Sequence, residues 1–385
     1  MAITLLVTDK DLVVQGDPLS GWTGLTCDLN FNQPAAGTVT LPAYPDVMAQ
    51  LQPGNRLVVI RDGAIWCAGP MESPQEFTWD LDSNTDPGTV SVNFSDDLAR
   101  VAGCLTYPDA TKAFNLQPAD TTARAISSTN AETIIRTLVN ENCGPGAIAA
   151  RRIEQLVLDS VASVGSSTSI STRFEALLDV CRTVAATDGL GFRTRQDGNA
   201  IKFGVYLPQD RTATARFSRD LGNLRSISYA LVAPLATAEL VQGGDITTAT
   251  GVYVEVDSGA DTDWYRVEKL QDQSGIADDA DGELTQAGNL ALGDDNPQSS
   301  LSTVTVDTDD LKAGRDFFLG DKVTVVLPTG LEVQDVVRTI SLAADPEGGE
   351  VVTSVVGNQD QSTASATTRV VRELSRRLGR LESRR

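Results

Sequence analysis

The feature that most constrains the fold is a strand motif that the chain contains twice. Residues 54–60 read Gly-Asn-Arg-Leu-Val-Val-Ile, and residues 320–326 read Gly-Asp-Lys-Val-Thr-Val-Val. In both copies a Gly and a turn-forming Asn or Asp precede a basic residue and a β-branched or aliphatic run. Gly gives the backbone freedom for a tight turn, Asn and Asp bond their own backbone, and Val and Ile suit a pleated strand. The motif therefore predicts two strands, each entered from a tight turn.

The segments after the two motifs also correspond. A second predicted strand follows each motif, at residues 64–68 and 331–337, and after a longer excursion a closing strand covers residues 89–94 and 351–356. We interpret this order as a degenerate duplication of one β-barrel or sandwich unit, with other material between the copies. The alternative is that two unrelated barrels each contain a Gly-led strand.

The length of 385 residues exceeds what one ordinary hydrophobic core supports, which indicates two or three domains. We predict a mainly β protein with an α/β insert. Residues 1–112 form the first β-barrel domain, residues 113–212 the α/β domain, and residues 213–358 the second β-barrel domain with an acidic, helix-containing insertion. Residues 359–385 form a linker and a basic amphipathic helix.

The α/β domain is predicted from two helical patterns and a hairpin. Thr129-x-x-Glu132 and Thr172-x-x-Glu175 have the spacing of capping boxes, and apolar residues recur at helical spacing after each. Two alternating segments then flank Asp197-Gly198-Asn199, which is a hairpin signal. In the second β domain, Leu284, Ala287, Leu290 and Ala291 predict one short amphipathic helix that ends at Gly293.

Charge limits the classes of partner. The chain has 52 acidic and 31 basic residues and a net charge of −21, so it is a poor direct binder of nucleic acid or of anionic membranes. No apolar 18-residue stretch predicts a membrane span, and no signal peptide is apparent. The acidic residues are most concentrated between residues 245 and 310, which contain sixteen Asp or Glu and only two basic residues, Arg266 and Lys269.

Composition argues against catalysis. The chain has no His, which removes Ser-His-Asp and Cys-His arrangements and the usual mixed zinc sites. Its five cysteines occur singly and are expected to be buried small hydrophobes. Residues 279–282, Asp-Ala-Asp-Gly, resemble part of a calcium loop but fail the pattern at its first and last positions. We expect no enzyme, no cofactor and no metal site.

The C-terminal segment reverses the charge. Residues 369–385 contain seven Arg and two Glu, after a Ser-, Thr- and Ala-rich linker. An amphipathic helix of this length is marginal alone, so it needs a partner: other copies of itself, another protein, or its own domain. The candidate interface residues, an apolar seam at a-d-a-d spacing, are Val371, Leu374, Leu378 and Leu381.

The order of these motifs resembles the hub-type minor tail proteins of long-tailed phages, particularly phages of actinobacteria. The resemblance rests on residues 54–60, on Asn130-Ala131-Glu132-Thr133-Ile134-Ile135-Arg136, on residues 217–224 (Phe-Ser-Arg-Asp-Leu-Gly-Asn-Leu) and on residues 318–323. It covers the chain to about Gly357, and the terminal helix lies outside it.

The resemblance implies a structural virion protein, a homotrimeric hub at the tail tip or baseplate that is assembled in the host cytoplasm. Two barrels per copy would give six similar units under the sixfold tail tube, around the DNA exit channel. The implied partners are further copies of the chain, tail-tube or distal tail proteins on one side, and tip or fibre proteins on the other. Two alternatives stay open: a tail-associated cell-wall hydrolase, and a carbohydrate-binding adhesin that uses Trp22, Trp66 or Trp79.

Overall fold

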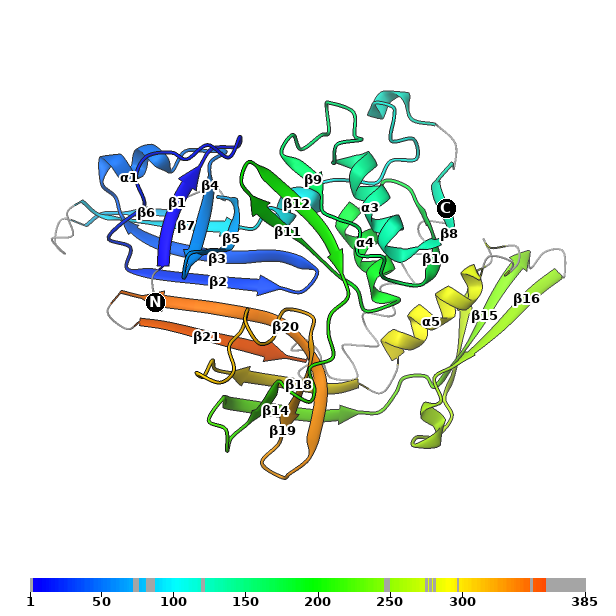
Figure 1. Cartoon of the computed structure of the whole chain (residues 1–385). Coiled ribbons are helices and arrows are strands. Elements are labelled where there is room, and N and C mark those ends of the chain that lie inside the picture. Colours follow the sequence, from blue (N-terminus) through cyan, green and yellow to red (C-terminus); the bar gives the residue numbers. More distant parts are fainter. Residues whose placement is uncertain are drawn as a thin grey trace.

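The computed structural model describes residues 3–71, 76–80, 87–118, 122–245, 250–273, 276, 279, 282–295, 298–346 and 349–357. Strands dominate and helices are few (Figure 1), so the predicted mainly β fold with an α/β insert is confirmed. The predicted C-terminal helix lies outside the described residues.

The N-terminal β unit has two layers. β4, the strand of the first motif, lies between β1 and β5 in one sheet, and β2, β3, β7 and β6 follow one another in the other. Gly54 has a φ of 86°, so the turn before β4 uses the conformation that the motif predicted. The elements are β1 (Ile3–Thr8), β2 (Gly24–Asn30), β3 (Gln33–Pro42), α1 (Pro45–Gln50), β4 (Arg56–Arg61), β5 (Ala64–Pro70), β6 (Glu76–Thr78) and β7 (Thr89–Ser95).

The second β unit has a comparable arrangement. β19, the strand of the second motif, lies between β13 and β20, and β14 pairs with β18. Backbone amides of β21 donate to side chains of β18, with Ser354 N 3.2 Å from Thr305 Oγ1 and Val356 N 3.3 Å from Thr303 Oγ1. The elements are β13 (Arg216–Ser218), β14 (Leu224–Val232), β18 (Gln298–Thr305), β19 (Lys322–Val326), β20 (Glu332–Asp345) and β21 (Gly349–Val356).

The two units differ in one pairing direction. β1 runs antiparallel to β4, whereas β13 runs parallel to β19. Both repeated strands form an antiparallel hairpin with the next strand, β4 with β5 and β19 with β20. Each repeated strand therefore lies between the strand that follows it in the sequence and one other strand, which runs antiparallel to it in the first unit and parallel to it in the second.

β20 joins the two units into one body. Its first half pairs with β19, and its second half pairs with β2 over Leu25↔Ala344 to Asn30↔Thr339. Figure 1 shows β2 and β20 side by side, where the blue and orange sheets meet. One hydrophobic core runs through both units, from Leu5 to Val356.

The α/β insert has a second core, built by α3 and α4 against the sheet of β9, β11 and β12. α2, which lies within residues 1–112, packs into this core through Leu98 and Val101. The elements are α2 (Leu98–Ala102), the 3-10 turn η1 (Phe114–Leu116), β8 (Arg124–Asn130), α3 (Ala131–Asn142), β9 (Leu156–Leu158), β10 (Ser167–Thr172), α4 (Leu177–Ala186), β11 (Gly191–Asp197) and β12 (Ala200–Tyr206).

Both predicted capping boxes are wrong. Asn130 caps α3, accepting a hydrogen bond from Thr133 N at 3.3 Å, and Glu132 turns inward to accept from Ala162 N and Val164 N. α4 begins at Leu177 without a side-chain cap, and Thr172 instead donates to Glu175 at 2.6 Å. The helices were predicted correctly by their apolar spacing, but Glu132 bonds to a distant segment, and Thr172 and Glu175 bond to each other before α4 begins.

The acidic insertion of the second unit forms a small module between β14 and β18, which we call the projecting module because it extends away from the rest of the molecule in Figure 1. Asp279, from the sequence that resembled a calcium loop, accepts bonds from Leu284 N at 2.8 Å and Thr285 N at 3.1 Å at the start of α5. The predicted helix extends two residues beyond Gly293. The elements are β15 (Ala238–Asp245), β16 (Thr250–Asp257), the 3-10 turn η3 (Ala260–Thr262), β17 (Glu268–Asp272) and α5 (Glu283–Asp295).

Candidate assembly surfaces

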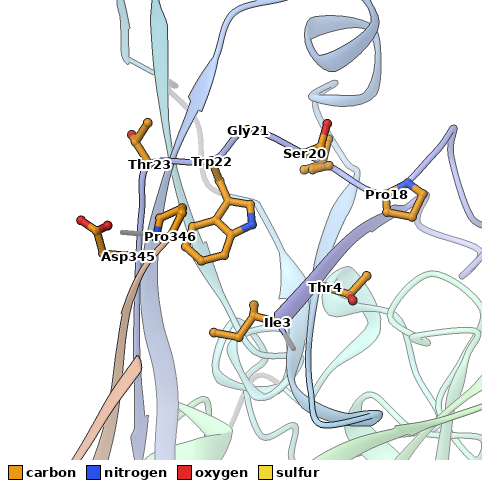
Figure 2. A pocket seen from close by; sticks show the side chains of 10 residues that line it. Ile3, Thr4, Pro18, Ser20, Gly21, Trp22, Thr23, Asp345 and Pro346 are labelled. Atoms are coloured by element: carbon orange, nitrogen blue, oxygen red, sulfur yellow. The ribbon is translucent and has the colours of Figure 1, made fainter. Parts of the chain in front are cut away.

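A pocket of about 780 Å³ opens where the N-terminal strand approaches the end of β20. It is lined mainly by apolar groups, among them Ile3, Leu19, Trp22 and Pro346. Figure 2 shows the Trp22 indole in the middle of this pocket, with Ile3, Thr4 and Pro18 on one side and Asp345 and Pro346 on the other. Because β1 and β20 belong to different β units, the pocket lies at the junction of the two units. Its apolar lining can accept an apolar side chain or a flat ring.

The three tryptophans considered for carbohydrate binding occupy different environments. Trp22 lines the pocket, and Trp66 is half-buried with the Arg61 guanidinium 4.9 Å above its ring. The Trp79 side chain is 52% exposed, close to β6. The three rings therefore lie in different surroundings, and Trp22 is the one that lines the pocket of Figure 2.

A buried ion pair fixes the α/β insert to the first β unit. Arg56, the basic residue of the first motif, is 2% exposed and donates to Asp97, to Thr8 Oγ1 at 2.9 Å and to Gln196 Oε1 at 3.1 Å. Burial raises the pKa of Asp97, and the hydrogen bond and charge of Arg56 oppose that rise. Since Gln196 belongs to β11, one guanidinium connects β1, the segment before α2 and the insert.

Further hydrogen bonds hold the insert against both β units. The side chain of Asn32 donates to Leu190 O and accepts from Phe192 N, each at 2.8 Å. Tyr206 donates to Leu319 O at 3.1 Å, beside the second motif. The insert is therefore bonded at the β2–β3 turn and at the entrance of β19, and it forms one body with the two β units.

The acidic and cysteine side chains of the described residues are the candidates for metal-binding clusters. Within those ranges no group of three or more acidic or cysteine side chains has the geometry to hold a metal ion. Asp257, one of the acidic residues of the insertion, is bonded to Gly259 N and to Arg266. None of the described helices combines the length and apolar character needed to cross a lipid bilayer.

The seam residues predicted as an interface, Val371, Leu374, Leu378 and Leu381, lie outside the described residues. Their role stays a prediction. Sequence reasoning missed the Trp22 pocket as a junction of two units, because its walls come from residues more than 300 positions apart. It also missed the buried role of Arg56, since a base at the start of a strand usually faces solvent.

Comparison with known families decides the relationship. Residues 4–358 match the model of the siphovirus ReqiPepy6 Gp37-like protein family. The chain belongs to this family. The match ends beside the last described residue, Gly357, and confirms the resemblance to tail proteins of long-tailed phages that the motif order predicted.

Solved structures share the fold of this family member. A 43 kDa tail protein of prophage MuSo2 from Shewanella oneidensis matches with a TM-score of 0.61 at 12% identity, covering 93% of this chain and 99% of that one. A tail protein from Neisseria meningitidis MC58 gives 0.57 at 12% identity, over 93% and 97% of the two chains. Prophage tail protein gp18 from Listeria monocytogenes EGD-e gives 0.53 at 11% identity, over 97% and 99%. No curated protein matches the chain.

Proposed function

We propose that this chain is a structural component of a siphovirus tail, a homotrimeric hub that joins the sixfold tail tube to distal tip or fibre proteins. The family match and the fold shared with three tail proteins support the tail assignment. In this proposal the chain acts through surfaces, without catalysis or cofactor. It is part of the virion and is assembled in the host cytoplasm.

The observation that carries the trimer is the pair of β units in one chain. β4 lies between β1 and β5, β19 lies between β13 and β20, and the β2–β20 pairing holds the two units in one fixed relation. Three such chains present six comparable units, which suits contact with a sixfold tube, because symmetric assemblies repeat the same contact around an axis. We extend the proposal to residues 1–112 and 213–358 as related domains, with the insert of residues 113–212 outside the ring.

A ring of this kind surrounds the DNA exit channel. Its acidic character fits that place, since a net charge of −21 keeps a passing polyanion from adhering to the wall. The seam of residues 371–381 is proposed as a further interface, and its seven neighbouring arginines call for an acidic partner.

Mass measurement and imaging test the hub. Light scattering of the purified chain is expected to give three times the chain mass of 40.8 kDa. Cryo-electron microscopy of intact tails is expected to show three copies at the tip, with six β units facing the tube. Six copies per tail, or a position along the tube shaft, would contradict the proposal. Clearing of peptidoglycan by the purified chain would favour the hydrolase instead, and binding to host cells would favour the adhesin.

A further inference from the structure

The projecting module has a sheet with one covered and one open face. α5 covers the first: an added Cβ at Gly288 would lie 2.7 Å from Val256 Cγ2 and 2.8 Å from Val241 Cγ2. Gly243 lies equally close to Leu284 of the same helix. Successive side chains of a strand alternate between faces, so residues between these ones point away from α5.

The open face carries a row of exposed apolar side chains. Leu240 pairs with Leu270 on β17, and the neighbouring pair joins Gln242 to Tyr253 on β16, so these side chains share one face. Leu240 is 40% exposed, Leu270 55% and Tyr253 59%. These three side chains therefore expose apolar surface to water, and a binding partner could cover that surface.

Carboxylates border this apolar row. Glu255 pairs with Leu240, while Asp257 and Glu268 both pair with Ala238, so all three lie on the open face. Arg266 is bonded to all three, which leaves one positive charge among three negative ones. The open face therefore combines exposed apolar groups with excess negative charge, and its complement is a basic amphipathic segment.

Residues 369–385 of this chain have that composition. Their apolar positions repeat at the spacing of a helix face, and seven arginines surround them with only two glutamates. The two surfaces match in both respects, apolar row against apolar seam and carboxylates against guanidinium groups, which favour bidentate contact with carboxylates.

The last described residue lies near the base of the module. A Cβ added to Gly357 would be 2.1 Å from the carbonyl oxygen of Leu301 on β18. β18 begins three residues earlier at Gln298, which pairs with Val232, the last residue of β14 before the module. The eleven residues 358–368 can span about 36 Å when extended, and a strand of eight residues such as β15 is about 26 Å long. The linker therefore has the reach to place residues 369–385 on the open face.

We propose that the open face of the projecting module, formed by β15, β16 and β17, binds residues 369–385 of the same chain. The seam of Val371, Leu374, Leu378 and Leu381 lies on Leu240, Tyr253 and Leu270, and the arginines face Glu255, Asp257 and Glu268. The module is then the acidic partner that the basic segment needs. The inference rests on the interface proposed for the seam but not on the trimer, so the two are tested by separate readouts.

A disulfide cross-link in the full chain tests the contact. Leu270→Cys with Leu378→Cys is expected to form an intramolecular disulfide under mild oxidation, seen as a faster band on a non-reducing gel. The matched control is Leu331→Cys with Leu378→Cys, because Leu331 is 50% exposed but lies at the β19–β20 turn. Both pairs are made in a Cys104→Ser background, since Cys104 is the half-buried native cysteine. The Leu270 pair is expected to react about tenfold faster or more, because docking raises the effective concentration well above that of a free tether.

Three results would overturn the proposal. Equal rates for the two pairs would mean that the segment has no preferred place on the module. A dimer band that grows with concentration would assign the segment to a neighbouring copy. Hydrogen exchange gives an independent readout: amides of residues 369–385 are expected to be protected in the wild type and to lose that protection in Glu255→Lys with Glu268→Lys, and unchanged protection would contradict the docking. Light scattering of the same samples reports the trimer separately.

Discussion

The strands β4 and β19 carry the same order of residue types but bury opposite members of it. In the first unit the base is buried: Arg56 is 2% exposed and paired with Asp97, while the side chain of Asn55 donates to Gln50 O at 2.8 Å. In the second unit Lys322 is exposed and the acid is buried. Asp321 is 3% exposed and accepts from Arg211 Nε at 2.7 Å, Gln209 N at 2.8 Å and Phe318 N at 3.0 Å.

The chain that passes over the start of each strand accounts for this difference. After β7 the first unit continues into α2, and Asp97 at that turn reaches Arg56. In the second unit residues 209–211 cross the entrance of β19, where Lys322 N donates to Gln209 O at 3.0 Å and Asp321 takes the Arg211 side chain. The shared motif thus fixes the hairpin and the apolar face of each strand. Its polar residues, in contrast, bond to the chain segment that passes over the start of the strand, and this segment differs between the two units.

The largest expected difference in stability is between variants of the two basic residues, Arg56 and Lys322. Arg56→Met leaves Asp97 buried without its counterion and is expected to reduce the free energy of unfolding by about 3–5 kcal/mol. Lys322→Met changes an exposed side chain and is expected to alter it by no more than about 0.5 kcal/mol. Urea unfolding followed by circular dichroism measures both. If both variants lose a similar amount of unfolding free energy, the ionic environments of the two strands are alike and the comparison is wrong.

The glycines that open the two strands give an intermediate effect. Gly54 and Gly320 have φ values of 86° and 88°, so an Ala at either position adopts a strained backbone, at a cost of about 1–2 kcal/mol. A Cβ at Gly54 meets no atom within 4 Å, whereas one at Gly320 would lie 2.3 Å from Phe31 Cε2. Gly320→Ala is therefore expected to cost a further amount of about 1–3 kcal/mol from overpacking.

Thermal unfolding of the two Gly→Ala variants checks this difference. An equal fall in the midpoint for both would mean that the Phe31 ring moves aside at no cost, and that backbone strain alone matters at these turns. A fall confined to Gly54→Ala would reverse the comparison.

The smallest expected effect concerns pH. Each β unit buries one carboxyl whose pKa is raised to about 7, Asp96 in the first unit and Glu239 of the projecting module in the second, mainly through burial. A pKa that is higher in the folded state means that the folded chain holds the proton more tightly. The stabilisation is complete below the ordinary pKa of these carboxyls and is lost as the pH rises through about 7.

Glu239→Gln removes this loss in the second unit, because Gln carries no charge to bury. The variant is expected to lose less thermal stability than the wild type between pH 5 and pH 8, and Asp96→Asn provides the matched comparison in the first unit. Midpoints from differential scanning calorimetry at the two pH values give the difference. If the unfolding midpoints of the wild type and of Glu239→Gln change by the same amount between pH 5 and pH 8, the buried-carboxyl interpretation is contradicted.

Sequence patterns predicted the local elements well where one periodicity prevailed. The apolar alternation of residues 57–60 and 323–326, the helix stripe beginning at Ile134 and the hairpin at Gly198 all correspond to observed elements. The second stripe was predicted from Phe174 onward, but α4 begins at Leu177, and Phe174 lies before it with a φ of 53°. The capping box at Glu132 failed because Glu132 accepts bonds from the distant amides of Ala162 and Val164, which the spacing of a box cannot reveal. The second box failed because Thr172 and Glu175 bond to each other before α4 begins at Leu177. The seam of residues 371–381 and its partner remain predictions.

The sequence by itself determined the two repeated strands, the two long helices of the insert, the absence of His, and the order of motifs that leads to a tail-protein family. These properties depend on residue type and on spacing over a few positions. Only the tertiary structure decided that β2 pairs with β20 across more than 300 residues, and that Arg56 and Asp321 are the buried members of the two motifs. The physical reason is that strand pairing and ionic partnership depend on which surfaces meet once the core has formed, and many registers satisfy the same local alternation.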